Sequence, residues 1–149
     1  MKITFKKEKG WWPWQRQDLA RRVMHHAKYM TGLVPDEGYA YDIKVKVILT
    51  KFKNAYGDAY GFEDDPESFE IRLSSKANDK RLVQTIYHEM CHIKQFYFEG
   101  LELSDKPVWK GKTFSNADYW DAPWEVEARK FEKKYLRIWK KSLDFEGRF

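Results

Sequence analysis

The stretch that decides the fold is NDKRLVQTIYHEMCHIKQFYFEG, residues 78–100. Apolar side chains recur along it at spacings of three and four, which predicts a helix from Asp79 to about Phe98. The apolar stripe consists of Leu82, Val83, Ile86, Met90, Ile93 and Tyr97. Asn78 suits the N-cap and Gly100 the end of such a helix. His88 and His92 lie roughly opposite the stripe, so one face can serve a core and another face a site.

The string His88-Glu89-Met90-Cys91-His92 has the spacing of a metal site. Residues four apart on a helix lie one turn above each other, so both imidazoles can reach one ion. Glu89 then lies beside the ion without binding it, where it can accept a proton from a metal-activated water. The pattern is typical of zinc metallopeptidases of the zincin class, whereas the plainer interpretation is two polar surface histidines.

The third ligand is predicted to be a carboxylate. The metzincin pattern needs a glycine and a histidine at the positions that Gln95 and Phe98 occupy, so it is excluded. The other two histidines, His25 and His26, precede the motif. Cys91 lies about 100° around the helix from His92 and is poorly aimed at a shared ion.

Two glutamates at the start of the last predicted helix, Glu125 and Glu127, are the best candidates for this ligand. Helix phase alone does not choose between them, and each could instead complement the helix dipole. Asp118 and Asp121 are weaker candidates, and Asp121 is better used as a helix cap.

The remaining patterns predict an α+β fold in one domain, residues 1–149, with a small sheet packed on the motif helix between N-terminal and C-terminal helices. We expect a helix over 14–31, strands over 43–50 and 68–74, and an irregular aromatic strand over 54–62. Residues 63–66 are predicted to be a turn and 100–121 a loop. The last helix is expected to start at Asp121 or Ala122, with Pro123 in its first turn, and to run to about Lys141 along a stripe of Trp124, Ala128, Phe131, Tyr135, Ile138 and Trp139.

The motif from His88 to His92, followed after a loop by the Glu-x-x-Ala helix start at Glu125, resembles the short glutamate-zincins. These are the minigluzincins and related SprT-like proteins of phages and bacteria, and the resemblance extends loosely over residues 56–131. It implies a zincin-like fold and a zinc metalloendopeptidase that acts on a peptide or protein. In that family the two histidines and the later glutamate bind Zn²⁺ and the motif glutamate is the general base. The resemblance therefore implies that Glu125 is the third ligand, because Glu125 stands three residues before the small Ala128.

Other parts of the family pattern differ in this chain. SprT proteases proper use a third histidine and often carry a zinc ribbon, and both are missing, so DNA-linked proteolysis is not carried over. For the donor that stabilises the oxyanion, our candidate is Tyr119, with Tyr97 and His26 as alternatives. The plainer interpretation of Tyr119, which the sequence favours, is an ordinary packed aromatic. The substrate is expected to add along an edge strand, for which residues 54–62 are the best segment.

Composition favours a cytoplasmic location, in a bacterium or a phage-infected host, with no membrane partner. The single cysteine excludes an intrachain disulfide, and no apolar segment has the length of a signal peptide core or a membrane span. The net charge of +5 is uneven, since residues 1–30 hold eight basic against two acidic side chains.

Two alternatives to a peptidase follow from the sequence. The first is a catalytically silent zincin-fold module with a regulatory or binding role. The second is a protein associated with nucleic acid through a basic set, although no nucleic-acid motif accompanies the charge. This set consists of Lys6, Lys7, Arg16, Arg21 and Arg22.

Overall fold

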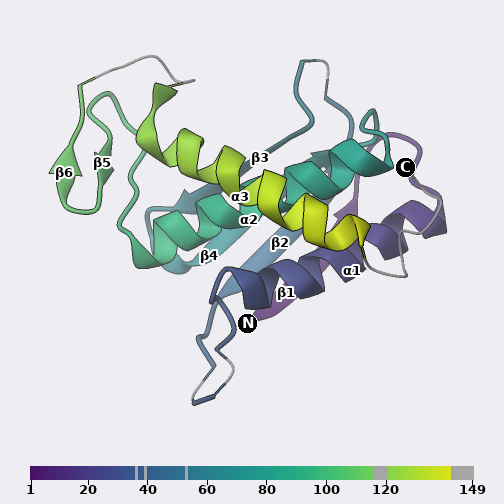
Figure 1. Ribbon diagram of the computed structural model, residues 1–149, viewed down its shortest axis with the longest axis horizontal. Helices are drawn as coiled ribbons and strands as arrows, with labels where there is room; N and C mark the ends of the chain where they lie inside the picture. Colours follow the sequence, from purple (N-terminus) through teal and green to yellow (C-terminus); the bar gives the residue numbers. More distant parts are fainter. Residues whose placement is uncertain (36, 39, 53, 116–120, 142–149) are drawn as a thin grey trace.

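Three helices and a small mixed sheet make up the architecture, which confirms the α+β prediction (Figure 1). The computed structural model describes residues 1–149 except 36, 39, 53, 116–120 and 142–149. In chain order the elements are β1 (Lys2–Lys7), α1 (Trp14–Met30), β2 (Lys44–Thr50), β3 (Gly57–Phe62), β4 (Asp65–Ser74), α2 (Asp79–Phe98), β5 (Val108–Trp109), β6 (Lys112–Thr113) and α3 (Pro123–Lys140).

The main sheet has four strands in the order β1-β2-β4-β3. Strands β1, β2 and β4 are parallel, whereas β3 pairs antiparallel with β4 and forms the edge. The register places Val47 opposite Ile71 and Leu49 opposite Leu73, so the apolar side chains of neighbouring strands share one face. The prediction that the 54–62 segment supplies an edge strand is therefore confirmed.

All three helices lie on one side of this sheet (Figure 1). The apolar face of the sheet packs against α1 and α2, and α3 packs on α2 from the other side. Helix α2 is therefore enclosed on two sides and buries residues around most of its circumference. The core includes Leu19, Val23 and Ala27 from α1, and Leu82, Ile86, Met90 and Ile93 from α2.

The predicted bounds of α2 are confirmed. The Asn78 side chain accepts a hydrogen bond of 2.8 Å from the backbone N–H of Arg81, which caps the first turn. The helix ends at Phe98, and Gly100 then adopts a φ of +65°, a conformation that favours glycine. Among the described residues, no helix is long and apolar enough to cross a membrane.

The first strand was not predicted. Residues 2–7 alternate Ile3 and Phe5 with polar side chains, but three lysines obscure the period. Parallel pairing with β2 stabilises this segment. The pairing places Ile3 opposite Val45 and Phe5 opposite Val47. Strand formation here thus depends on a neighbour that lies about forty residues further along the chain.

Several predicted boundaries were also wrong. Asp65 and Pro66, assigned to a turn, are the first residues of β4. The predicted 100–121 loop contains the β5–β6 hairpin. In α3 Leu136, which was not in the predicted stripe, is buried, whereas Ile138 from that stripe is 44% exposed.

Gly57 is needed where β3 approaches α2. A Cβ at this position would lie 2.5 Å from Thr85 Cγ2 and 2.8 Å from the Arg72 carbonyl oxygen. We expect Gly57→Ala to lower the free energy of unfolding by about 1–3 kcal/mol, because the rigid backbone oxygen cannot yield. Gly61→Ala in the same strand is the control, since its Cβ meets only the Phe69 ring at 3.3 Å. Urea unfolding checks both, and equal stability of the two variants would contradict the prediction.

Candidate metal centre

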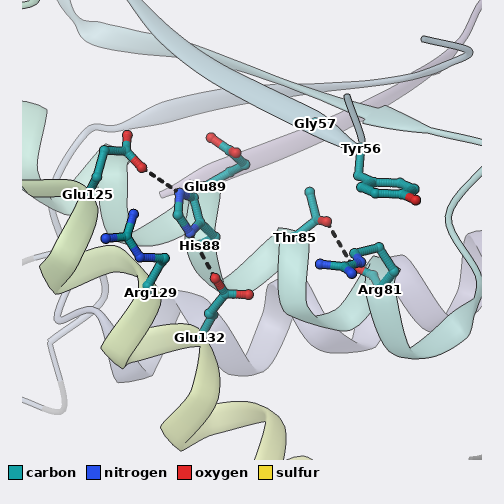
Figure 2. A pocket seen from close by; sticks show the side chains of 9 residues that line it. All are labelled: Tyr56, Gly57, Arg81, Thr85, His88, Glu89, Glu125, Arg129 and Glu132. Carbon is teal, nitrogen blue, oxygen red and sulfur yellow. Dashed lines mark hydrogen bonds and ion pairs between the residues drawn. The ribbon is translucent and has the colours of Figure 1, made fainter. Parts of the chain in front are cut away.

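Three side chains from two helices converge on one point. His88 and His92 extend from α2, and Glu125 extends from the first turn of α3. His92 Nε2 lies 2.9 Å from Glu125 Oε1, and His88 Nε2 lies 3.1 Å from Glu125 Oε2. The two Nε2 atoms are 3.2 Å apart. Figure 2 shows Glu125 facing His88 at the edge of a pocket.

This geometry fits a metal ion. The three ligand atoms lie within 4.8 Å of one another. Ligand atoms that surround a tetrahedral ion at about 2.0–2.2 Å are separated by roughly 3.3–3.6 Å, close to the spacings seen. Two imidazoles and one carboxylate form a donor set that suits Zn²⁺ and leaves one coordination position for water.

The position of Glu125 depends on the packing of α3 against α2. Glu125 is 4% exposed and His92 is 6% exposed. Ala128, one turn after Glu125, is fully buried, and a small side chain there lets the two helices approach closely. Of the two glutamates that helix phase left open, the structure therefore brings only Glu125 to the histidines.

A second layer of side chains orients the two imidazoles. His92 Nδ1 lies 2.7 Å from Gln95 Oε1, and His88 Nδ1 lies 3.2 Å from Glu132 Oε1. Both partners are acceptors, which assigns the Nδ1 proton and turns each Nε2 toward the centre. Glu132 was not among the site residues predicted from the sequence. The sequence does contain a signal for Glu132. It stands seven residues after Glu125, which places the two side chains on the same face of the last helix.

In the metal-free site the three groups form a charged cluster. Burial opposes protonation of His88, but hydrogen bonds to Glu125 and Glu132 outweigh it and raise its pKa to about 10. Burial also opposes protonation of His92, but its hydrogen bond to Glu125 together with the charges of Glu89 and Glu125 raises its pKa. Bonds from both histidines lower the pKa of Glu125 well below its usual range despite its burial. A metal ion must therefore displace protons from the imidazoles.

Glu89 adjoins the three-residue group without belonging to it. Its side chain is buried, and burial raises its pKa to about 7, although His92 and His88 act in the opposite sense. With His88 and Glu125 it lines a cavity of about 300 Å³ that is also bounded by Tyr56, Gly57, Arg81, Thr85, Arg129 and Glu132 (Figure 2). Glu89 thus has the position that a base acting on a water in this cavity requires.

Glu127 lies on the other side of α3 from the centre. It pairs with Lys94 Nζ at 3.1 Å and Lys110 Nζ at 3.8 Å, and it accepts a 3.1 Å hydrogen bond from Gln95 Nε2. By its place in the sequence, a Glu127 that is not the ligand is expected to point to solvent or to pair with a nearby base such as Lys130 or Lys134. It does pair with bases, but these are Lys94 from α2 and Lys110 from the β5–β6 hairpin rather than the two lysines of its own helix.

Cys91 points toward the ion pairs of Glu127, with its Sγ 3.9 Å from Glu127 Oε1. It is buried, and this burial raises its pKa to about 12. Cys91 does not belong to the three-residue group, and a thiol with a raised pKa is a poor nucleophile at neutral pH.

The other residues proposed from the sequence do not enter the centre. Tyr119 and Asp118 fall outside the described residues, and Asp121 is exposed and not part of the group. His26 and Tyr97 do not line the cavity. His26 Nδ1 instead lies 2.6 Å from the Tyr87 hydroxyl, and Tyr97 packs its ring against Tyr41 and Phe98.

Comparison of the chain with models of protein families, with curated proteins and with solved structures gives no match. The interpretation of the centre therefore depends on its own geometry.

The two glutamates are separable by mutation. We expect Glu125→Ala, like His88→Ala, to lower zinc affinity by at least tenfold, because each removes one of three protein ligands. Glu127→Ala should keep the metal and cost about 1 kcal/mol of stability, since it removes partners of Lys94 and Gln95. Zinc titration against a chromophoric chelator measures the affinities. Metal lost with Glu127→Ala and kept with Glu125→Ala would contradict the assignment.

Metal binding should release protons. Burial opposes protonation of both rings, but their acidic neighbours raise the pKa of His88 to about 10 and also raise that of His92, so imidazole protons must leave before the rings can bind an ion. We expect zinc affinity to fall as the pH falls from 8 to 6, with one to two protons released per ion. Calorimetry in buffers of different ionisation enthalpy gives this number. Proton release near zero at pH 7 would show that the cluster is not charged.

Proposed function

We propose that this protein is a zinc-dependent peptidase of the short glutamate-zincin type. The observation that supports this most directly is the group of His88, His92 and Glu125, which borders a cavity that also contains Glu89. Three protein ligands leave a fourth position for water, which is the arrangement of catalytic rather than structural zinc sites. The mixed sheet with one antiparallel edge strand beside the motif helix is consistent with a zincin-like fold.

Each residue has a role in the proposed hydrolysis. A bound divalent ion supplies Lewis-acid polarisation and lowers the pKa of a water. The Glu89 carboxylate accepts a proton from the attacking water and then delivers it to the leaving amine. His88, His92 and Glu125 would hold the ion, and Glu132 and Gln95 fix the orientations of the two rings through Nδ1.

The substrate is proposed to lie along β3. Among the described strands it pairs with β4 alone, so its outer edge offers backbone groups to an added peptide strand. Gly57 at the start of β3 and the preceding Tyr56 both line the cavity, which brings the edge of the sheet to the metal centre. Backbone pairing of this kind provides affinity with little demand on sequence.

A silent zincin-fold module is the main alternative, and the buried Glu89 at the cavity argues for activity. The nucleic-acid alternative stays a prediction. Lys6 pairs with Glu8, and Arg22 pairs with Asp18. Arg16 donates a 2.6 Å hydrogen bond to the carbonyl of Ser75. Salt-dependent binding to DNA would test this reading.

The general base provides the test of the function. We expect Glu89→Gln to keep about one zinc per chain and the native fold while it lowers peptide hydrolysis at least a hundredfold, because an amide cannot accept the proton. Cleavage of casein and of a broad peptide library, followed by mass spectrometry, measures activity. Gln84→Glu on the same helix is a control for charge changes. Wild-type activity in the Glu89→Gln variant would refute the mechanism.

A further inference from the structure

We propose that Arg81 binds a carboxylate of the substrate, within about three residues on the C-terminal side of the scissile bond. The proposal rests on the proposed peptidase function and names a substrate class for the same site. The carboxylate belongs either to an acidic side chain or to the C-terminus of the substrate.

Arg81 and the metal centre share one cavity and one helix face. Arg81, Thr85 and His88 follow one another along α2 at spacings of four and three, and all three line the cavity. Figure 2 shows Arg81 and Tyr56 at one end of this cavity, His88, Glu89 and Glu125 at the other, and Thr85 between them. Seven residues of helix span about 10 Å. An extended peptide covers that distance in about three residues.

The direction of the strands indicates which side of the substrate reaches Arg81. Strand β3 and helix α2 run the same way: Gly57 begins β3 beside Thr85, and β4, which is antiparallel to β3, leads into the start of α2. A peptide added antiparallel to β3, the commoner pairing, runs from the His92 end toward Arg81. Its residues that follow the scissile bond therefore approach Arg81.

The charges at the two ends of the cavity are different. The carboxylates of Glu89, Glu125 and Glu132 lie at the metal end together with the Arg129 guanidinium, and two of these carboxylates contact His88. At the other end the Arg81 guanidinium lies 4.9 Å from the centre of the Tyr56 ring. Among the ion pairs of the described residues none involves Arg81, so its N–H donors are available to a ligand. A guanidinium stacked on an aromatic ring keeps its edge for a bidentate carboxylate.

Peptide binding tests this proposal separately from activity. The protein is zinc-loaded Glu89→Gln. The probes are fluorescent peptides with Gln, Glu or Lys two residues after the scissile bond, or Glu two residues before it, each as a free acid and as a C-terminal amide. We expect Glu or a free C-terminus to bind about tenfold more tightly than the neutral form. Adding Arg81→Ala should remove this preference, and Arg81→Glu should reverse it toward a lysine peptide.

Lys80→Ala is the matched control, because Lys80 is an exposed base on the same turn that does not line the cavity. It should leave the preference intact. The comparison of Glu with Gln peptides tests whether Arg81 binds an acidic side chain. The comparison of free acids with amides tests whether it binds the C-terminus. Equal binding of charged and neutral peptides, a preference for Glu on the N-terminal side, or equal weakening of all peptides by Arg81→Ala would each overturn the proposal.

The outcomes also separate this inference from the proposed function. If peptides bind with an Arg81-dependent carboxylate preference but the wild-type protein cleaves none of them, the peptidase function fails and the carboxylate site stands. If the wild-type protein cleaves peptides without a carboxylate preference, the function stands and the role of Arg81 is wrong.

Discussion

The contact between α2 and α3 is the interaction on which the centre depends. Two imidazoles on α2 and one carboxylate on α3 are brought together in a largely buried site, where an unpaired charge is costly. Each of the three groups is therefore stable there only because the others are present, or because an ion takes their place. The packing of the two helices and the chemistry of the site are thus one constraint.

Gln95 connects this constraint to the rest of the fold. It accepts from His92 Nδ1, and its amide nitrogen donates to the Trp124 carbonyl at 3.0 Å and to Glu127. One buried side chain on α2 thereby orients a ligand and also holds the residue that precedes Glu125. On the opposite side of α2 the sheet supplies a rigid apolar backing through Ile71 and Leu73. The histidines are fixed from both sides, which favours a preorganised centre.

The edge of the sheet provides the access. Strand β3 is the antiparallel strand of an otherwise parallel main sheet, and it lies beside α2. Gly57 allows its backbone to approach Thr85 closely, so that the strand borders the cavity that contains His88 and Glu89. A peptide at this edge would meet the metal centre and Arg81 in one extended conformation, which is why the proposed substrate class and the fold are connected.

Local spacing in the sequence was enough to predict α2 with its cap, the pairing of His88 with His92 and the place of Glu89, because these depend on the helical period and on residues a few positions apart. The same holds for the alternation in β2 and β4. Tertiary structure was needed to form the lysine-rich β1, whose partner strand is distant in the chain. It was also needed to choose Glu125 over Glu127, since helix phase left both open and only the contact with α2 distinguishes them. Glu132 and Arg81 gained their places in the same way: their surroundings are made by other elements, and a side chain's role in a site is set by what folds against it.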